Sequence, residues 1–287
     1  MYDNDKKVAD MSKFAALILT HGRPGLSDTY DKLRSCGYTG RVVFVIDNED
    51  IKAQEYYDKY GSENVFMFNK SWAANRCDSM NNFGSRKAIL FARNESFLIA
   101  KELGIDYFVQ LDDDYYYFGH RGEHGAKKTN NLDLVFKSFI EFLLNTNENV
   151  KTIAFSQGGD HIGGWNKDVL VKRKAMNSFF CLTNRPFKFY GILNEDVNCY
   201  LINGSRGEIF LTYMAFQLDQ ADTQQNPEGI TTIYLRYGTY VKSFYSIIGA
   251  PSCTYIKLMG CNAMRLHHSI NWQNAIPMIL SEKHKKN

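Results

Sequence analysis

Apolar residues in the first part of the chain fall into short, uninterrupted runs separated by more polar, helix-forming stretches. The apolar runs occupy residues 14–20, 41–46, 65–68 and 107–111. Runs of this length without alternation are typical of strands that are buried on both faces. The helix-like stretches occupy residues 26–36, 55–60 and 86–102. Strand and helix therefore alternate, which predicts an α/β fold, a Rossmann-like and mostly parallel sheet with helices on both faces.

Beyond residue 115 the pattern is less regular. No repeat, low-complexity segment or linker interrupts the chain, so we expect one domain over residues 1–287 with a more irregular second half. Helices are predicted at residues 132–144, 197–202 and 240–248, and strands at residues 151–156 and 187–192.

Three consecutive aspartates, at positions 112–114, follow the fourth predicted strand. Adjacent carboxylates repel each other, so a cation is expected nearby. Mg²⁺ and Mn²⁺ prefer oxygen ligands and commonly share them with a diphosphate. The carboxyl ends of the strands are also where such sheets bind their ligands. We therefore predict that Asp112 and Asp114 hold Mn²⁺ or Mg²⁺, with a solvated acidic turn as the alternative.

The composition narrows the classes of partner. There are 34 Lys and Arg against 31 Asp and Glu, and a net charge of +3 does not mark the chain as a nucleic-acid binder. The six cysteines form no C-x-x-C pair, which excludes a zinc ribbon and suits reduced thiols in a cytoplasm. No apolar run approaches the ~18 residues of a membrane span, and the polar N-terminus is not a signal peptide. We expect residues 281–287 to form a solvated basic tail.

The order of the motifs resembles the nucleotide-sugar half of GT-A glycosyltransferases. The motifs are THGRP at residues 20–24, Asp47 after the second strand, ARN at residues 92–94 and LDDD at residues 111–114. The resemblance implies that residues 14–118 bind a UDP-sugar and that residues 119–280 form an acceptor-side half. It also implies that the D-x-D carboxylates hold the metal against the donor diphosphate.

Several residues of the first half are therefore candidates to contact the donor. Backbone amides and a guanidinium near residues 20–24 can cradle the nucleotide, and the acid after the second strand can bind uracil or ribose. Basic residues on the following helix can neutralise phosphates. Alternatively, Arg93 is a surface residue paired with Glu95 or Glu102. The donor-binding candidates are Thr20, Gly22, Arg23, Asp47, Arg86, Lys87, Arg93 and Asp113.

An acid pair in the second half, Glu195 and Asp196, is the candidate catalytic site. In GT-A enzymes a similar pair lies beside the acceptor, and in inverting members one acid is the general base. An acceptor hydroxyl needs such a base as it attacks the anomeric carbon. We assign the base to Asp196, with Glu195 as the alternate. Ordinary capping of a helix is the competing interpretation.

Two adjacent histidines, His267 and His268, are candidates for a third metal ligand. The family resemblance implies a histidine late in the chain, and neutral imidazole binds Mn²⁺ beside carboxylates. Neighbouring side chains on a strand face opposite ways, so only one of them would reach the metal. A half-buried structural histidine is the alternative.

Basic and aromatic residues are interleaved over residues 236–245. This mixture can grip a nucleic-acid backbone and stack on a flipped base, although an ordinary amphipathic helix has the same composition. Trp165, among glycines, is a candidate lid residue. The acceptor-binding candidates are Trp165, Arg236, Tyr240 and Lys242.

Taken over most of its length, the chain resembles phage DNA-modifying sugar transferases related to the base-J glucosyltransferase. The resemblance implies transfer of a hexose or pentose to hydroxymethylpyrimidines in DNA, in the cytoplasm of the host if the protein is phage-encoded. Two other functions remain open: transfer to a polysaccharide or protein, and a non-catalytic nucleotide-binding module. DNA retention that falls steeply with salt would favour the first function. The sequence does not fix the sugar, the stereochemistry or the oligomeric state.

Overall fold

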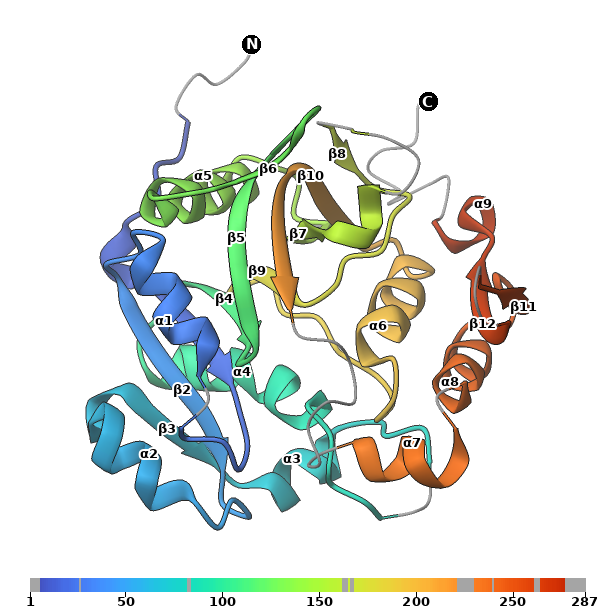
Figure 1. The fold of residues 1–287 in the computed structure, drawn as a ribbon, viewed down its shortest axis with the longest axis horizontal. Coiled ribbons are helices and arrows are strands. Elements are labelled where there is room, and N and C mark those ends of the chain that lie inside the picture. The colour runs from blue at the N-terminus through green and yellow to red at the C-terminus, as the bar shows by residue number, and fades with distance from the viewer. Residues whose placement is uncertain are drawn as a thin grey trace.

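A ten-stranded mixed sheet forms the centre of the computed structural model, which describes residues 6–25, 27–81, 84–161, 165, 168–220, 230–238, 240–260 and 264–276. The strand order is β3-β2-β1-β4-β9-β7-β10-β5-β6, and β8 pairs with β10 (Figure 1). The strands are β1 Phe14–Leu19, β2 Arg41–Asp47, β3 Val65–Phe68, β4 Tyr107–Asp112, β5 Tyr115–Gly122, β6 Gly125–Lys128, β7 Val150–Gln157, β8 Val169–Leu170, β9 Ser178–Leu182 and β10 Ile209–Gln220.

Strands β1, β2, β3, β4, β6, β7 and β10 run in one direction, and β5, β8 and β9 run in the other. The predicted fold class is therefore confirmed: an α/β fold with a mostly parallel sheet. The four predicted strands of the first half are β1 to β4, and they form the fully parallel part of the sheet. The sheet continues into the second half through the antiparallel pair β4–β9.

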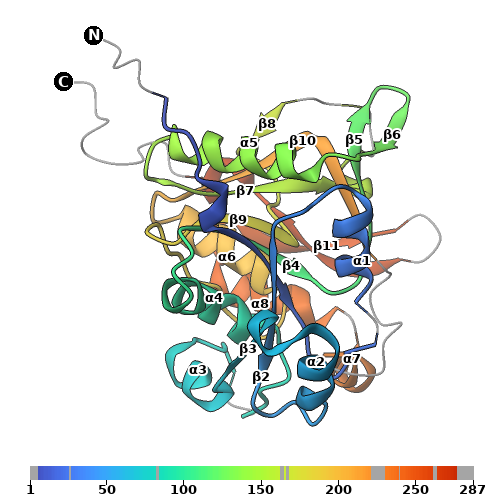
Figure 2. The same cartoon turned by 90° about the vertical axis from the view of Figure 1, so that its left-hand side faces the viewer.

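Helices cover both faces of the sheet (Figure 2). Along β1, Leu17 belongs to an apolar cluster that includes residues of α4 and α6, while Ile18 belongs to another that includes residues of α1, α2 and α5. This alternation produces two apolar cores, one on each face. The helices are α1 Asp28–Ser35, α2 Ala53–Tyr60, α3 Lys70–Arg76, α4 Leu90–Glu102, α5 Leu132–Leu144, α6 Glu195–Gly204, α7 Thr231–Tyr237, α8 Val241–Gly249 and α9 Trp272–Ala275, and the 3₁₀ turns are η1 Met11–Lys13, η2 Ser62–Asn64 and η3 Gly158–His161. None of the helices in the described residues is long and apolar enough to cross a membrane.

A separate two-stranded sheet lies outside the main one. It consists of β11 Thr254–Met259 and β12 Arg265–Ile270, which pair antiparallel. The hairpin packs on α8, and α8 packs on α6 at the edge of the molecule farthest from α2 (Figure 1).

Two predicted elements differ from the structure. The strand predicted at residues 187–192 is absent, because Phe187 and Phe189 are buried side chains of an extended segment that pairs with no strand among the described residues. The helix predicted at residues 86–102 begins at Leu90, because residues 84–87 have no regular structure and Gly84 has a positive φ of 64°.

Candidate active site

The carboxyl ends of the first parallel strands bring the predicted donor residues to one edge of the sheet. Leu19 lies beside Asp112 in the β1–β4 pair and beside Val45 in the β1–β2 pair. Thr20 therefore faces the acidic turn, and Asp47 lies at the end of the next strand. This adjacency follows from parallel pairing in register.

The middle acid of the turn, Asp113, points into the protein and is only 1% exposed. It accepts a hydrogen bond of 2.5 Å from the Thr20 hydroxyl and lies 2.8 Å from Nη2 of Arg23. Burial raises the pKa of Asp113 to about 6 in spite of Arg23. The turn is also held from α1, where Thr29 donates its hydroxyl to the backbone oxygen of Asp112 over 2.6 Å. Asp113 is thus a buried support of the turn beside two predicted donor residues.

The two outer acids, Asp112 and Asp114, carry the metal prediction. Burial, followed by repulsion from Asp112 and Asp113, raises the pKa of Asp114 to about 7. Its Oδ1 atom is buried and has no hydrogen-bond partner among the described residues. No group of three or more His, Cys, Asp or Glu side chains in the described part of the chain is arranged to hold a metal. Of the two outer carboxylates, Asp114 therefore has a buried oxygen without a protein partner among the described residues.

Arg93 connects the acidic turn to the catalytic candidates. Its side chain is 1% exposed; Nη2 donates to Asp112 over 2.9 Å, and Nε donates to Glu195 over 3.1 Å. The guanidinium also lies over the rings of Phe179 and Phe189, 5.2 and 5.6 Å from their centroids. Its Nη1 is buried without a hydrogen-bond partner among the described residues. The alternative pairing of Arg93 with Glu95 or Glu102 is not seen, because α4 turns this side chain inward.

The acid pair lies at the start of α6 and is nearly buried, with Glu195 9% and Asp196 7% exposed. Burial and the adjacent Asp196 raise the pKa of Glu195 to about 7. Burial likewise raises the pKa of Asp196, against the charges of Arg93 and Lys242. Asp196 accepts a 2.7 Å hydrogen bond from the backbone N–H of Val197. In the described residues it has no side-chain partner, so the two acids differ in how firmly they are held.

Further polar residues surround Asp47, one of the predicted donor residues. Asp47 is 2.8 Å from Nδ1 of His21 and 2.9 Å from Nζ of Lys70. Burial opposes ionisation of Asp47, but these two partners outweigh it and lower its pKa. The N–H of Gly22, which has a positive φ of 72°, donates to Asp50 over 2.7 Å. Lys70 and Asp50 were missed, and His21 was part of the motif at residues 20–24 without being a donor-binding candidate.

The remaining donor candidates lie further out. Arg86 forms an ion pair of 2.6 Å with Glu49, which lies in the loop after β2. Lys87 is exposed, and its backbone N–H donates to the hydroxyl of Ser85. Neither residue contacts the acidic turn directly.

The two histidines lie on β12, on the acceptor side. Nδ1 of His268 is 3.3 Å from the side-chain amide of Asn194, and the backbone N–H of His268 donates to the hydroxyl of Ser243 on α8. Burial, followed by the charges of His267 and Lys242, lowers the pKa of His268 to about 4. His268 is therefore neutral at physiological pH, as a metal ligand must be. Its metal-binding role stays a prediction, since neither histidine forms a metal-holding group with the acids in the described residues.

The four acceptor candidates are not all in one place. Lys242 of α8 interacts with Asp196, and burial lowers its pKa. Arg236 and Tyr240 are exposed at α7 and at the start of α8. Trp165 donates to the backbone oxygen of Arg121, near the far end of β5. At 3.3 Å per residue, Arg121 is about 23 Å along the strand from the acidic turn. The structure therefore groups three of the candidates around α7 and α8 and places Trp165 elsewhere.

A cavity of about 400 Å³ lies between α7, α8 and the segment that leads into the acid pair. Leu193 lines it two residues before Glu195, together with apolar and aromatic side chains of both helices. Its lining residues are Ser85, Ile192, Leu193, Thr232, Ile233, Arg236, Tyr237, Val241 and Tyr245.

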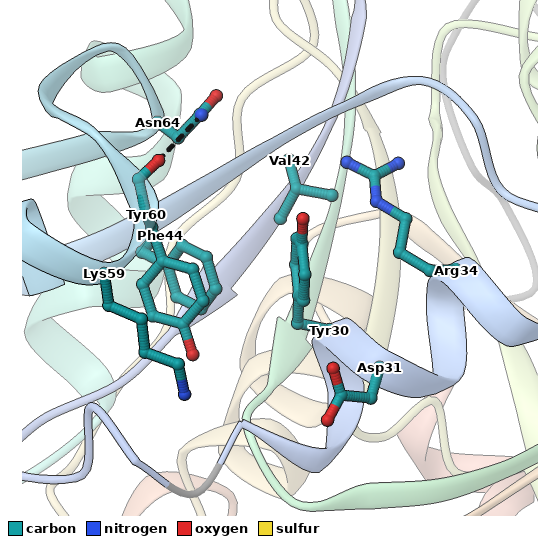
Figure 3. A pocket seen from close by; sticks show the side chains of 8 residues that line it. All are labelled: Tyr30, Asp31, Arg34, Val42, Phe44, Lys59, Tyr60 and Asn64. Atoms are coloured by element: carbon teal, nitrogen blue, oxygen red, sulfur yellow. Dashed lines mark hydrogen bonds between the residues drawn. The ribbon is translucent and has the colours of Figure 1, made fainter.

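A second cavity, of about 250 Å³, lies between α1 and α2 over β2 (Figure 3). Several of its polar side chains already have partners. Lys59 and Tyr60 donate to the backbone oxygen of Pro24, and Arg34 donates to the backbone oxygens of Tyr38 and Gly40. We assign this cavity a structural role.

The acids at the carboxyl edge of the α/β sheet and the second pair of buried acids therefore lie on either side of Arg93. Residues 14–229 match the model of the TET-Associated Glycosyltransferase family. The match spans well over half of the chain, so the protein belongs to this family and is a glycosyltransferase.

Solved structures with a similar course of the chain have low sequence identity. Glucosyl-3-phosphoglycerate synthase from Mycobacterium tuberculosis, in complex with Mg²⁺ and UDP, is 10% identical with a TM-score of 0.46, over 90% of this chain and 87% of that chain. The mannosyltransferase PcManGT from Pyrobaculum calidifontis, in complex with GDP-Man and Mn²⁺, is 10% identical with a TM-score of 0.46, over 86% of this chain and 77% of that chain. A comparison with curated proteins gives no match.

Proposed function

We propose that the protein transfers a sugar from a UDP-sugar, with Mn²⁺ or Mg²⁺, to the hydroxymethyl group of a modified pyrimidine in DNA. The observation that carries this proposal is the pairing of two acidic sites through one buried arginine, Arg93, in a member of a glycosyltransferase family. The resemblance to phage enzymes related to the base-J glucosyltransferase supports the acceptor. The UDP-sugar and the DNA would both be available to the enzyme in a cytoplasm.

The residues of the acidic turn fit a divalent metal. Asp112 and Asp114 supply hard oxygen ligands two positions apart, and the Oδ1 atom of Asp114 is buried without a protein partner among the described residues. A bound cation would offset the repulsion that raises the pKa of Asp114. When bound, the metal would neutralise the charge that develops on the departing diphosphate.

The contacts of the acid pair favour Asp196 as the general base. Glu195 is held by Nε of Arg93, which stabilises its charge and fixes its position. Asp196 accepts only a backbone hydrogen bond among the described residues, so an oxygen remains available to take the proton of the acceptor hydroxyl. Its raised pKa makes it a better proton acceptor than an ordinary aspartate near neutral pH. An Asp196 base predicts inversion at the anomeric carbon.

The cavity beside the acid pair suits an extruded base. Its volume of about 400 Å³ is within the usual range for small-molecule sites, and Tyr237 and Tyr245 contribute aromatic surface. Enzymes that modify a base commonly flip it out of the duplex into such a pocket. We place the modified pyrimidine in this cavity, with Arg236 at its edge and its hydroxymethyl group directed toward Asp196.

The donor site is tested by calorimetry of UDP and UDP-glucose binding with and without Mn²⁺. We expect metal-dependent binding by the wild type that is lost in Asp114→Ala and kept in Asp58→Ala, a matched removal of an exposed aspartate on α2. Binding that is unaffected by Mn²⁺ or by Asp114→Ala would contradict the metal assignment.

The acceptor is tested by incubating enzyme and radiolabelled UDP-sugar with three substrates: a hydroxymethylcytosine duplex, the same duplex with cytosine, and a polysaccharide. We expect label only in the first. Label in the polysaccharide alone would replace the DNA acceptor with the alternative function.

A further inference from the structure

Acidic residues are missing from one long segment of the chain. The protein has 31 Asp and Glu in 287 residues, so a stretch of 53 residues would be expected to hold about six, yet residues 229–281 hold none. The same segment holds four permanently cationic residues, Arg236, Lys242, Lys257 and Arg265. The family match ends at residue 229, so the segment lies outside it.

The described part of this segment lies within residues 230–276 and is called here the C-terminal module. It contains α7, α8, the β11–β12 hairpin and α9. The module packs against α6 through α8 (Figure 1). Asn194, which directly precedes the acid pair, donates to the backbone oxygen of Lys242 and to the hydroxyl of Ser246. The module is therefore fixed to the start of α6, beside the proposed base.

The hairpin has a cationic face turned away from α8. The ring of His268 lies 3.3 Å from the side-chain amide of Asn194 at the start of α6, so His268 and its cross-strand partner Ile256 lie on the inner face, and residues one position away lie on the outer face. Lys257 lies on that outer face. Met259, two positions further along β11, lies on the same face, and so does its cross-strand partner Arg265. Lys257 and Arg265 are exposed, and neither forms an ion pair with a described residue.

Aromatic rings are exposed on the same module. Tyr255 on the hairpin is 51% exposed, and Tyr237, Tyr240 and Phe244 on and between α7 and α8 are 45%, 47% and 44% exposed. Exposed rings among cations, without any carboxylate, match a ligand that combines phosphates with stackable bases. A protein partner would account for the exposed rings but not for the missing acids.

We propose that the C-terminal module is the surface that binds the DNA acceptor, with Lys257 and Arg265 on phosphates and exposed aromatic rings on bases. The inference rests on the proposed function, because it assigns the DNA of that proposal to the module that Asn194 fixes beside the acid pair. It adds a binding surface outside the part of the chain that matches the family.

The test compares DNA binding by the wild type with binding by Lys257→Gln/Arg265→Gln. The control is Arg41→Gln/Lys101→Gln, which removes two exposed cations from β2 and α4. Fluorescence anisotropy with a labelled 20-base-pair duplex and with its single strand is measured across a salt series. Loss of two phosphate contacts should lower the slope of log K against log salt by about 1.8, and affinity should fall at least tenfold at low salt. The control should bind like the wild type.

The outcomes separate this inference from the proposed function. Equal DNA binding by both double variants would overturn the inference and leave the DNA acceptor intact. No DNA binding by the wild type, with metal-dependent UDP binding retained, would overturn both the inference and the DNA acceptor but not the donor site. A dimeric wild type that becomes monomeric in Lys257→Gln/Arg265→Gln, with unchanged DNA binding, would make the module a contact between copies of the chain instead.

Discussion

Replacing Arg93 by methionine should destabilise the protein more than the loss of any exposed ion pair. Methionine keeps much of the apolar volume between Phe179 and Phe189 but removes the charge that pairs with Asp112 and Glu195. Removing one partner of a buried ion pair costs about 3–5 kcal/mol, because it leaves a buried charge without compensation.

Two features of the site place the expected loss near the lower end of that range. The side chain of Asp112 is 22% exposed, so water can solvate part of the carboxylate charge that Arg93 no longer pairs with. Glu195 can escape its unpaired charge by binding a proton, since its pKa is already about 7 beside Arg93. We expect a loss of about 3 kcal/mol in the free energy of unfolding at pH 8, which a domain with a total of ~5–15 kcal/mol tolerates.

The same argument predicts the pH dependence of the loss. Without Arg93, the folded-state pKa of Glu195 rises further above its unfolded value, so the folded variant binds a proton more tightly than the unfolded chain does. That stabilisation is present at low pH and disappears as pH rises through the folded pKa. The deficit relative to wild type should therefore shrink by about 1 kcal/mol between pH 8 and pH 6.

Urea unfolding of wild type, Arg93→Met, Glu195→Gln and the double variant at both pH values measures these quantities. Arg76→Met is the control, because Arg76 also pairs with a glutamate, Glu95, but is 50% exposed and should cost less than about 1 kcal/mol. An Arg93→Met loss as small as that of the control and equal at both pH values would refute the bridging role.

Two further predictions concern the chemistry. Asp196→Asn should lower kcat by a factor of about 10²–10⁴ while UDP binding stays unchanged, and near-normal turnover would show that Asp196 is not the base. Because the pKa of Asp114 is about 7 in the metal-free protein, protons should compete with Mn²⁺ below that pH. Mn²⁺ affinity should therefore fall from pH 8 to pH 5.5, with proton release detected by calorimetry in two buffers, and a flat affinity profile would contradict the raised pKa.

The first half of the fold could be predicted because its strands are buried on both faces. Such strands are continuous apolar runs, and the four predicted runs all became strands β1 to β4. Strands β5 and β10 mix buried residues with partly buried or exposed ones in no regular order, and they pair with each other from positions about 100 residues apart. Their pairing was therefore not evident. The aromatic run at residues 187–192 shows the opposite error, because its side chains fill a core without backbone pairing.

The site could be predicted only where it follows from strand ends. The adjacency of Thr20, Asp47 and the acidic turn is a consequence of parallel pairing, and it was expected. The contact between Arg93 and Glu195 joins residues 102 positions apart, and its existence depends on how α6 packs on the sheet. No local pattern encodes that packing, so the arginine was assigned to phosphates or to the surface.

The charges of the site are divided between its two sides, and this division fits two anionic substrates. In the proposed function a UDP-sugar would bring two phosphates toward the three aspartates at residues 112–114. Asp112 and Asp113 have arginine partners, and a bound metal ion would offset the remaining charge of Asp114. A DNA acceptor would be repelled by the same acids, but the surface offered to it, the C-terminal module, contains cations and no carboxylate. Each substrate is therefore drawn to one side only, and Arg93 lies where the two sides meet, held by one acid from each. On this argument the metal and the module each offset the repulsion between the acids and one anionic substrate. Loss of either should therefore weaken the binding of one substrate and leave the binding of the other unchanged.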